Sequence, residues 1–247
     1  MASSTPQRKA LTGSEKIFQL GTWRFEKLLS VKERDQSELD GGDTSERHEV
    51  YEAMRIDQPS KTPDIIKVKR QTGFWSNRNY RAPSDEIHRE IDNLRQLHNC
   101  MSTPELIYSC VDTQGSDDEL PGGYIAFIVM QKVPGRRLEI FERLTPHEQN
   151  RVRIAFVDAL WEFCSNYFIH SDSRRENLIW NSEANRCFII DLEDAEQCRG
   201  LTKNDVCLDP DEELGNWGLS DGESRGLLFD QKYMLMEYVK AKYLAID

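Results

Sequence analysis

The sequence predicts an α+β protein of two lobes, a small antiparallel-sheet lobe with one helix followed by a short, mostly helical lobe. Its 247 residues are enough for two such lobes. Short runs of β-forming residues and a single helical pattern occupy residues 17–133, whereas residues 134–247 open with a long amphipathic pattern. Between them lies Val133-Pro134-Gly135, which is typical of a turn, and we expect a cleft at this joint.

In the first lobe we expect strands joined by polar turns, preceded by a flexible tail at residues 1–16. The acidic, turn-rich segment 32–48 predicts a loop. Apolar residues recur at helical spacing over residues 87–97, so a helix should begin near Ser84 or Asp85, either of which can cap it. The expected strands are residues 17–31, 50–56, 65–69, 106–111 and 123–133. The second and third of these should form an antiparallel hairpin.

The second lobe should begin with a long helix, because Thr145, Pro146 and Glu148 form a capping-box start. The side chains expected on its buried face are those of Val152, Ala155, Phe156, Ala159, Leu160 and Phe163. Further along we expect a polar loop, a two-stranded hairpin, an irregular connection and a last helix, at residues 170–177, 178–180 with 187–191, 208–224 and 227–244.

The charge balance argues against two classes of partner. The chain has 32 Lys and Arg against 43 Asp and Glu, a net charge of −11, and an acidic surface repels both nucleic acid and anionic membranes. No apolar run is long enough to cross a bilayer, and the N-terminal residues lack the apolar core of a signal peptide. The six cysteines form no C-x-x-C pair, so we expect reduced thiols and a location in the cytosol or nucleus.

The polar loop carries the residues that point to chemistry. His170, Asp172 and Asn177 stand in the stretch HSDSRREN, and Asp191 ends the apolar run CFIID. Carboxylate and amide oxygens are the ligands that Mg²⁺ prefers, and a carboxylate can also accept a proton from a reacting hydroxyl. The alternative is a solvated charged turn that follows a helix.

The loop matches the H-x-D-x-x-x-x-N catalytic loop of the protein-kinase-like superfamily, and Asp191 stands where that superfamily has its metal-binding aspartate. Within it the chain resembles aminoglycoside- and choline-phosphotransferase-like proteins and the divergent kinase-like proteins of fungi. The resemblance implies ATP and Mg²⁺ as cofactors, with Asp172 as catalytic base and Asn177 and Asp191 as metal ligands. It implies that His170 holds the loop by hydrogen bonds and that Arg174 faces the transferred phosphoryl group.

The same resemblance implies a nucleotide site in the first lobe. The strand IIKVK would supply the lysine that binds the α- and β-phosphates, which is Lys67 or Lys69, and we favour Lys67 because apolar residues enclose it. Its glutamate partner on the following helix would be Glu90, with Glu86 as the alternative. Adenine would lie against the segment IAFIVMQKVPG, near Met130 and the main chain of Gln131, Lys132 and Val133.

Three features depart from the superfamily's usual pattern. No G-x-G-x-x-G is present, and the candidate for a phosphate-covering turn, Gly41-Gly42, stands between two aspartates that would repel phosphates. Ser171 replaces the arginine of the H-R-D form and Leu192-Glu193 replaces Phe-Gly, so control by a phosphorylated activation loop is not expected. Only 56 residues follow Asp191, without A-P-E, which argues against peptide docking of the usual kind.

These observations leave two functions open. The first is an ATP- and Mg²⁺-dependent phosphotransferase that acts on a hydroxyl of a small molecule or, as a second choice, of a protein. The alternative is a pseudokinase that serves as a protein-binding module, which the missing glycine loop and the acidic insertion favour. The sequence does not determine the acceptor or the oligomeric state.

Overall fold

The computed structural model describes residues 10–34, 44–58, 62–74, 83–198 and 210–220. The chain divides into two compact units. The first unit contains residues up to 95 together with residues 105–132, and the second contains residues 96–104 and those from 133 onward. Both helices and strands are present, which confirms the mixed α and β composition that the sequence predicts.

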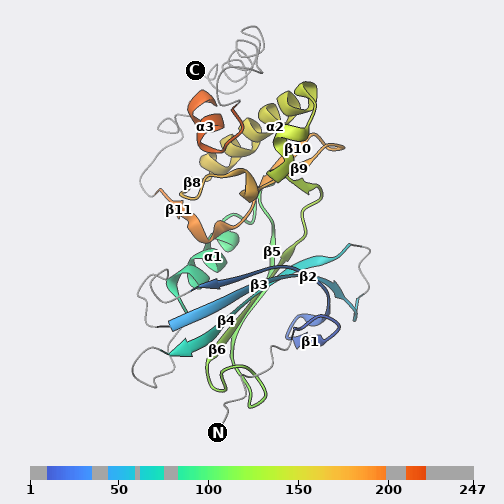
Figure 1. Ribbon diagram of the computed structural model, residues 1–247, viewed down its shortest axis with the longest axis vertical. Helices are drawn as coiled ribbons and strands as arrows, with labels where there is room; N and C mark the ends of the chain where they lie inside the picture. The colour runs from blue at the N-terminus through green and yellow to red at the C-terminus, as the bar shows by residue number, and fades with distance from the viewer. Residues whose placement is uncertain (1–9, 35–43, 59–61, 75–82, 199–209, 221–247) are drawn as a thin grey trace. The chain divides into compact units, whose positions relative to one another are not determined.

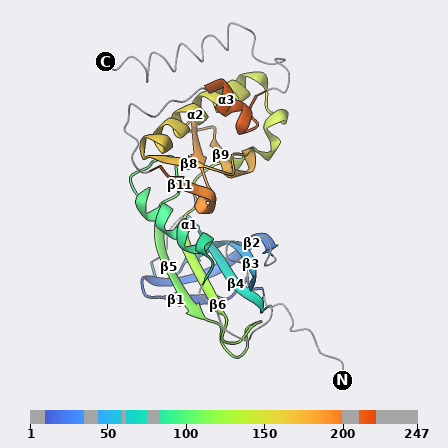
Figure 2. The same cartoon turned by 90° about the vertical axis from the view of Figure 1, so that its left-hand side faces the viewer.

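The first unit is built on a six-stranded antiparallel sheet (Figure 1). Its strands, in their order across the sheet, are β1 (Glu15–Phe18), β2 (Gly21–Arg34), β3 (Thr44–Arg55), β4 (Asp64–Phe74), β6 (Tyr124–Gln131) and β5 (Leu106–Thr113). Helix α1 (Asp85–Gln96) follows β4 in the chain (Figure 2). The predicted antiparallel hairpin of residues 50–56 and 65–69 is confirmed as part of the longer pair β3–β4.

One face of this sheet carries an aromatic core. Trp23 and Phe25 of β2 and Tyr51 of β3 are almost completely buried, and the rings of Phe25 and Tyr51 meet edge to face with centroids 5.0 Å apart. The other buried members of the cluster are Phe18, Ala53, Ile66, Val68, Ile125, Phe127 and Val129. Since alternate residues of a strand share a face, these side chains fix which face of β2, β3, β4 and β6 points inward.

The loop predicted over residues 32–48 is wrong at both ends. Strand β2 continues to Arg34 and β3 begins at Thr44, and the part of this predicted loop that lies outside the described residues is 35–43, which includes Gly41-Gly42. The two strand ends carry opposite charges in register, and the Glu33 carboxylate lies 2.6 Å from Arg47 Nε. Cross-strand charge pairs stabilise a ladder that single-residue propensities do not predict.

The predicted tail is also too long. Glu15 and Lys16 belong to β1, and the amide of Gly13 donates to the carbonyl of Phe25 at 2.7 Å. The amide of Leu11 donates to the Tyr51 hydroxyl at 3.3 Å. The described residues from 10 onward are therefore bound to the sheet, whereas residues 1–9 lie outside the described residues.

The second unit combines one long helix with short strands. Helix α2 (Pro146–Ser165) is its longest described element. The three-stranded sheet consists of β7 (Arg136–Arg137), β9 (Leu178–Asn181) and β10 (Arg186–Ile189), and the two-stranded sheet of β8 (Phe168–His170) and β11 (Ala195–Gln197). Short 3-10 helices cover Leu138–Arg143, Arg175–Asn177 and Leu192–Asp194. The predicted hairpin is thus confirmed as the pair β9–β10.

Helix α2 begins as the capping box predicts. The Thr145 side chain accepts a hydrogen bond from the amide of Glu148 at 3.2 Å, and Pro146 is the first helical residue. All six side chains predicted for the inner face are buried, which confirms the helical spacing. The cap satisfies an amide that has no partner inside the helix.

The connection predicted at residues 208–224 contains a helix that the sequence reasoning missed. Helix α3 (Pro210–Asn216) leads into Trp217, and Leu214, Trp217 and Leu219 are buried. The Trp217 ring packs 5.3 Å from the ring of Phe156 on α2. The helix predicted at residues 227–244 lies outside the described residues.

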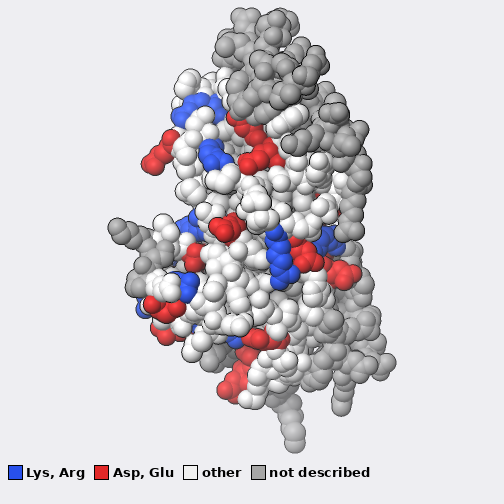
Figure 3. Space-filling view, turned by 180° about the vertical axis from the view of Figure 1, so that it is seen from behind, with Lys and Arg blue, Asp and Glu red and all other residues white. Residues whose placement is uncertain are grey.

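The surface carries both acidic and basic side chains (Figure 3), and three of the cysteines are buried. On the face shown in Figure 3, acidic and basic side chains lie near one another in small groups. Cys100, Cys164 and Cys187 are buried free thiols and Cys110 is half-buried. Within the described part of the chain, no helix combines the length and the apolar character needed to span a bilayer.

Candidate functional site

The loop HSDSRREN lies between two strands of the second unit that hold its ends. His170 is the last residue of β8 and pairs with Ala195 of β11, and the amide of Ser171 donates to the carbonyl of Asp194 at 2.8 Å. At the other end, the 3-10 turn Arg175–Asn177 leads directly into β9. The loop is therefore fixed by main-chain hydrogen bonds on both sides.

His170 ties this loop to the segment that carries Asp191. Its Nε2 donates to the carbonyl oxygens of Ile190 and Asp191, at 3.2 and 3.1 Å. The ring is buried and meets the Trp217 ring edge to face at a centroid distance of 5.3 Å. The side chain thus holds the loop from inside.

Asp172, Asn177 and Arg174 form the polar centre of the loop. The side-chain nitrogen of Asn177 donates to the main-chain carbonyl of Asp172 at 3.0 Å and to its carboxylate at 3.1 Å. Arg174 Nη2 lies 2.6 Å from the same carboxylate oxygen, Oδ2. The structure therefore pairs Arg174 with Asp172, and the phosphoryl-facing role that the resemblance implies for Arg174 stays a prediction.

Asp191 is held next to Asn177 through its neighbour. The amide of Ile190 donates to the carbonyl of Asn177 at 2.9 Å. Asp191 itself has φ 65° and ψ 58°, in the left-handed region, which aspartate adopts more readily than most residues. The chain turns sharply here, directly after β10.

These residues fit a magnesium ion by their chemistry. The amide nitrogen of Asn177 is used by Asp172, so its oxygen lies on the opposite side of the amide group. Asn177 and Asp191 offer the hard oxygen donors that Mg²⁺ prefers, and Mg²⁺ is usually held by one or two protein groups, with water and substrate phosphates as its other ligands. Within the described residues there is no group of three or more His, Cys, Asp or Glu side chains that could hold a metal.

In the first unit, both candidate lysines reach the same glutamate. Lys67 Nζ pairs with Glu90 Oε1, and Lys69 Nζ lies 2.8 Å from Glu90 Oε2. Glu86, the alternative partner, pairs instead with Arg34 of β2. The structure therefore brings Glu90 to the lysine strand and leaves both lysines beside it.

The lysines lie on the sheet face opposite the aromatic core, beside a second buried carboxylate. Glu46 is completely buried, its carboxylate lies 2.7 Å from His48 Nε2, and the Tyr124 hydroxyl donates to it. Burial raises the pKa of Glu46, but the hydrogen bonds from His48 and Tyr124 outweigh it and hold that pKa below its ordinary value.

Strand β6 ends at Gln131, inside the segment that is predicted to contact adenine. Met130 is buried, as is Val133, which belongs to the second unit. The amide of Gln131 donates to the carbonyl of Glu105 at 2.9 Å, so this amide is used inside the first unit and does not match the predicted role. The Lys132 side chain pairs with Glu52 at 2.6 Å.

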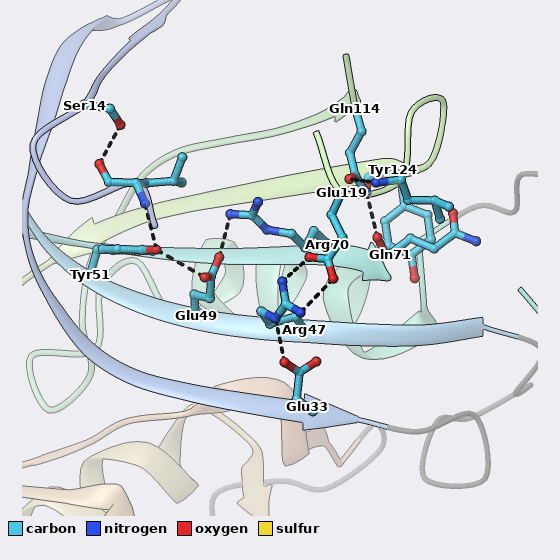
Figure 4. A network of polar contacts seen from close by, with 12 residues as sticks. Ser14, Glu33, Arg47, Glu49, Tyr51, Arg70, Gln71, Gln114, Glu119 and Tyr124 are labelled. Carbon is cyan, nitrogen blue, oxygen red and sulfur yellow. Dashed lines mark hydrogen bonds and ion pairs between the residues drawn. The ribbon is translucent and has the colours of Figure 1, made fainter. Parts of the chain in front are cut away.

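Figure 4 shows a polar network on the core face of the sheet that the sequence reasoning missed. Arg47 binds Glu33 on the neighbouring strand and Glu119 in the β5–β6 connection. These two carboxylates raise the pKa of Arg47 further above its ordinary value. Arg70 lies 2.6 Å from Glu49. The signal was the alternation of residues 47, 49 and 51, which places charged residues in line with a core tyrosine.

Comparison with solved structures gives a distant neighbour of this chain. No protein-family model matches the chain, and no curated protein sequence matches it. A solved structure described as the Cydia pomonella granulovirus kinase, PK-1, superposes with a TM-score of 0.45 at 16% sequence identity. The match covers 71% of this chain and 52% of the viral kinase, so the matched region spans about half of that protein.

Proposed function

We propose that the protein is a kinase-like phosphotransferase that moves the γ-phosphoryl group of ATP to a hydroxyl of a small molecule or, as a second choice, of a protein. The observation that carries the proposal is the bonding of the loop, in which Asn177 holds the carboxylate of Asp172 at 3.1 Å while its carbonyl receives the amide that precedes Asp191. The three oxygen-bearing residues of the motif are thereby tied together. A merely solvated turn would not require a buried asparagine at its centre.

The roles of these residues follow from the reaction. The acceptor oxygen forms a bond to the γ-phosphorus as the bond from that phosphorus to the bridging oxygen of ADP breaks, and the hydroxyl proton passes to Asp172. Asn177 and Asp191 would hold Mg²⁺, which neutralises charge on the phosphate oxygens. His170 keeps the Asp191 main chain in place. Arg174, bound to Asp172, orients that carboxylate.

The first unit would supply the groups that bind the nucleotide. Lys67 or Lys69 would bind phosphate oxygens, and Glu90 is the carboxylate with which both lysines pair. Met130, Lys132 and Val133 remain candidates for adenine contacts, whereas the Gln131 amide is already bonded to Glu105. The carbonyl of Gln131 can still accept a hydrogen bond, because a carbonyl oxygen has two lone pairs.

The test measures transfer of labelled γ-phosphate from Mg²⁺·ATP to water and to a panel of small hydroxyl compounds, including aminoglycosides and choline. Asp172→Asn should lower transfer by about 100-fold or more, because it removes the proton acceptor and leaves the side-chain size unchanged. Asp92→Asn is the matched control, since Asp92 is exposed on α1 and pairs with Arg95. Equal rates for the wild type and Asp172→Asn would exclude Asp172 as the base.

A protein-binding pseudokinase is the second candidate, and the ion pair of Arg174 with Asp172 favours it. The Asp172 oxygen that would take the hydroxyl proton is already bound by the Arg174 guanidinium at 2.6 Å and by the Asn177 side chain at 3.1 Å. A thermal-shift titration separates the two functions. Millimolar Mg²⁺·ATP should raise the melting temperature of a phosphotransferase, because a ligand that binds only the folded state stabilises it. An unchanged melting temperature would favour the binding module.

A further inference from the structure

Lys67 and Lys69 of β4 both pair with the carboxylate of Glu90. We propose that Lys69 is a positioning residue that holds Glu90 permanently, so that Lys67 is the lysine released to the nucleotide. This inference rests on the proposed phosphotransfer and deepens it. It also decides between the two lysines, which the sequence cannot do because both lie on one face at a spacing of two.

The first step is the geometry of the carboxylate. Each lysine takes a different oxygen of Glu90, Lys67 the Oε1 and Lys69 the Oε2. Of the neighbouring carboxylates, Glu86 pairs with Arg34, and Glu46 pairs with His48 and accepts from Tyr124. Glu90 is thus the acidic group that both lysines share.

The second step is burial. The exposed fraction of the side chain is 1% for Lys69 and 1% for Glu90, but 12% for Lys67. On the sheet, Lys69 stands between His48 of β3 and Ala126 of β6, whereas Lys67 stands between Val50 and Ile128. A side chain that is closed off from solvent cannot reach a ligand that arrives from solvent. Lys67 keeps part of its surface accessible.

The third step is charge. A buried carboxylate with no cationic partner is costly, so a site with one lysine loses stability when a phosphate draws that lysine away. Lys67 can therefore turn toward phosphate oxygens while Lys69 continues to neutralise Glu90.

Two matched variants, Lys67→Met and Lys69→Met, test this division, because each removes one ammonium and keeps a flexible side chain of similar length. The first measurement is urea unfolding without nucleotide. We expect the midpoint to fall more for Lys69→Met than for Lys67→Met, since only the former leaves Glu90 without its fully buried partner. In Lys69→Met/Glu90→Gln the carboxylate is gone, and the midpoint should recover toward that of the wild type.

The second measurement is the Kd for Mg²⁺·ATP by calorimetry. Lys67→Met should weaken binding by about tenfold or more, the usual effect of losing a hydrogen bond to a charged group. Lys69→Met should weaken binding as well, because Glu90 then keeps Lys67 as its remaining partner. Lys69→Met/Glu90→Gln should restore affinity, since no carboxylate then competes for Lys67. A residue that served stability alone would not show this rescue of affinity.

The outcomes separate the inference from the proposed function. If the wild type binds no Mg²⁺·ATP, the phosphotransfer proposal fails, and the unfolding series alone decides whether Lys69 is the fixed partner. If Lys67→Met lowers the midpoint as much as Lys69→Met does, the division of roles is wrong. If ATP affinity depends on Lys69 and is unaffected by Lys67→Met, the roles are reversed and the inference is overturned while the proposed function stands.

Discussion

Asn177 and Asp172 are joined twice, through a bond from the asparagine side chain to the aspartate carbonyl at 3.0 Å and another to its carboxylate at 3.1 Å. Asn177 is buried, and the carbonyl of the same residue receives the amide of Ile190. One residue therefore sets both the conformation of the loop and the orientation of the proposed base. The asparagine is a structural part of the loop as well as a candidate metal ligand.

This relationship predicts the result of replacing Asn177 with alanine. The variant loses both bonds to Asp172 inside a buried site, so the free energy of unfolding should fall by about 1–3 kcal/mol. Urea unfolding measures it. Asn181→Ala is the control, because the Asn181 side chain bonds the amides of Glu183 and Ala184 in an exposed turn, and its loss should cost less. An equal loss in both variants would contradict the central role of Asn177.

Gly135 gives a prediction about the backbone. Its φ is +128°, and a Cβ added there would clash with the carbonyl oxygen of Trp180, the β9 residue that stands opposite Arg136 of β7. Gly135→Ala should destabilise the protein by about 1–3 kcal/mol, the range for strained backbone at such a site. Gly215→Ala on α3, where nothing lies closer than 4.0 Å, should be neutral or slightly stabilising. Similar unfolding midpoints for both variants would disprove the steric argument.

Glu46 predicts how stability depends on pH. Its pKa in the folded protein is lower than the ordinary value of 4.5, because hydrogen bonds from His48 and Tyr124 outweigh the effect of burial. A lowered pKa contributes stability above the unfolded pKa, and this contribution is lost as the pH falls through the folded pKa. The stability difference between the wild type and Glu46→Gln should therefore be largest near neutral pH and shrink below about pH 4.5.

Urea unfolding at several pH values between 3 and 7 measures this difference. Glu26→Gln is the control, because Glu26 is exposed and pairs with Arg24. A difference for Glu46→Gln that stays constant over the whole range would show that the ionised carboxylate is not what stabilises this site.

The buried thiols predict the pattern of chemical labelling. Burial raises the pKa of Cys164 to about 12 and raises that of Cys187 as well. Because the thiolate is the reactive form, neither residue should react with iodoacetamide at pH 8 in the folded protein, and both should react in urea. Mass spectrometry of tryptic peptides reads the sites. Rapid labelling of Cys187 without urea would contradict its burial against the carbonyl of Val152.

The sequence by itself determined the elements whose cause is local. Helix α2 begins where Thr145, Pro146 and Glu148 predict, because a cap and its amide are three residues apart. The hairpins β3–β4 and β9–β10 follow from short β-forming runs with turns between them. His170, Asp172 and Asn177 likewise lie in one loop because they are only a few residues apart in the stretch HSDSRREN.

The tertiary structure alone decided what depends on distant partners. The charged ends of β2 and β3 adopt strand conformation because Glu33 pairs with Arg47 on the neighbouring strand. Each segment taken alone has a sequence that is typical of a loop. Helix α3 was missed because its stability comes from burying Leu214 and Trp217 rather than from its short, glycine-containing sequence.

The charged contacts of the candidate site also depend on the tertiary structure. Spacing along β4 cannot tell which lysine meets Glu90, because the answer depends on where α1 packs, and both lysines reach it. The sequence also could not show that Arg174 binds Asp172, because a long, exposed side chain can reach several groups and its partner depends on the three-dimensional structure. Local periodicity and capping therefore determined the elements and the motif, whereas long-range charge pairing determined how far the strands extend and which charged groups meet.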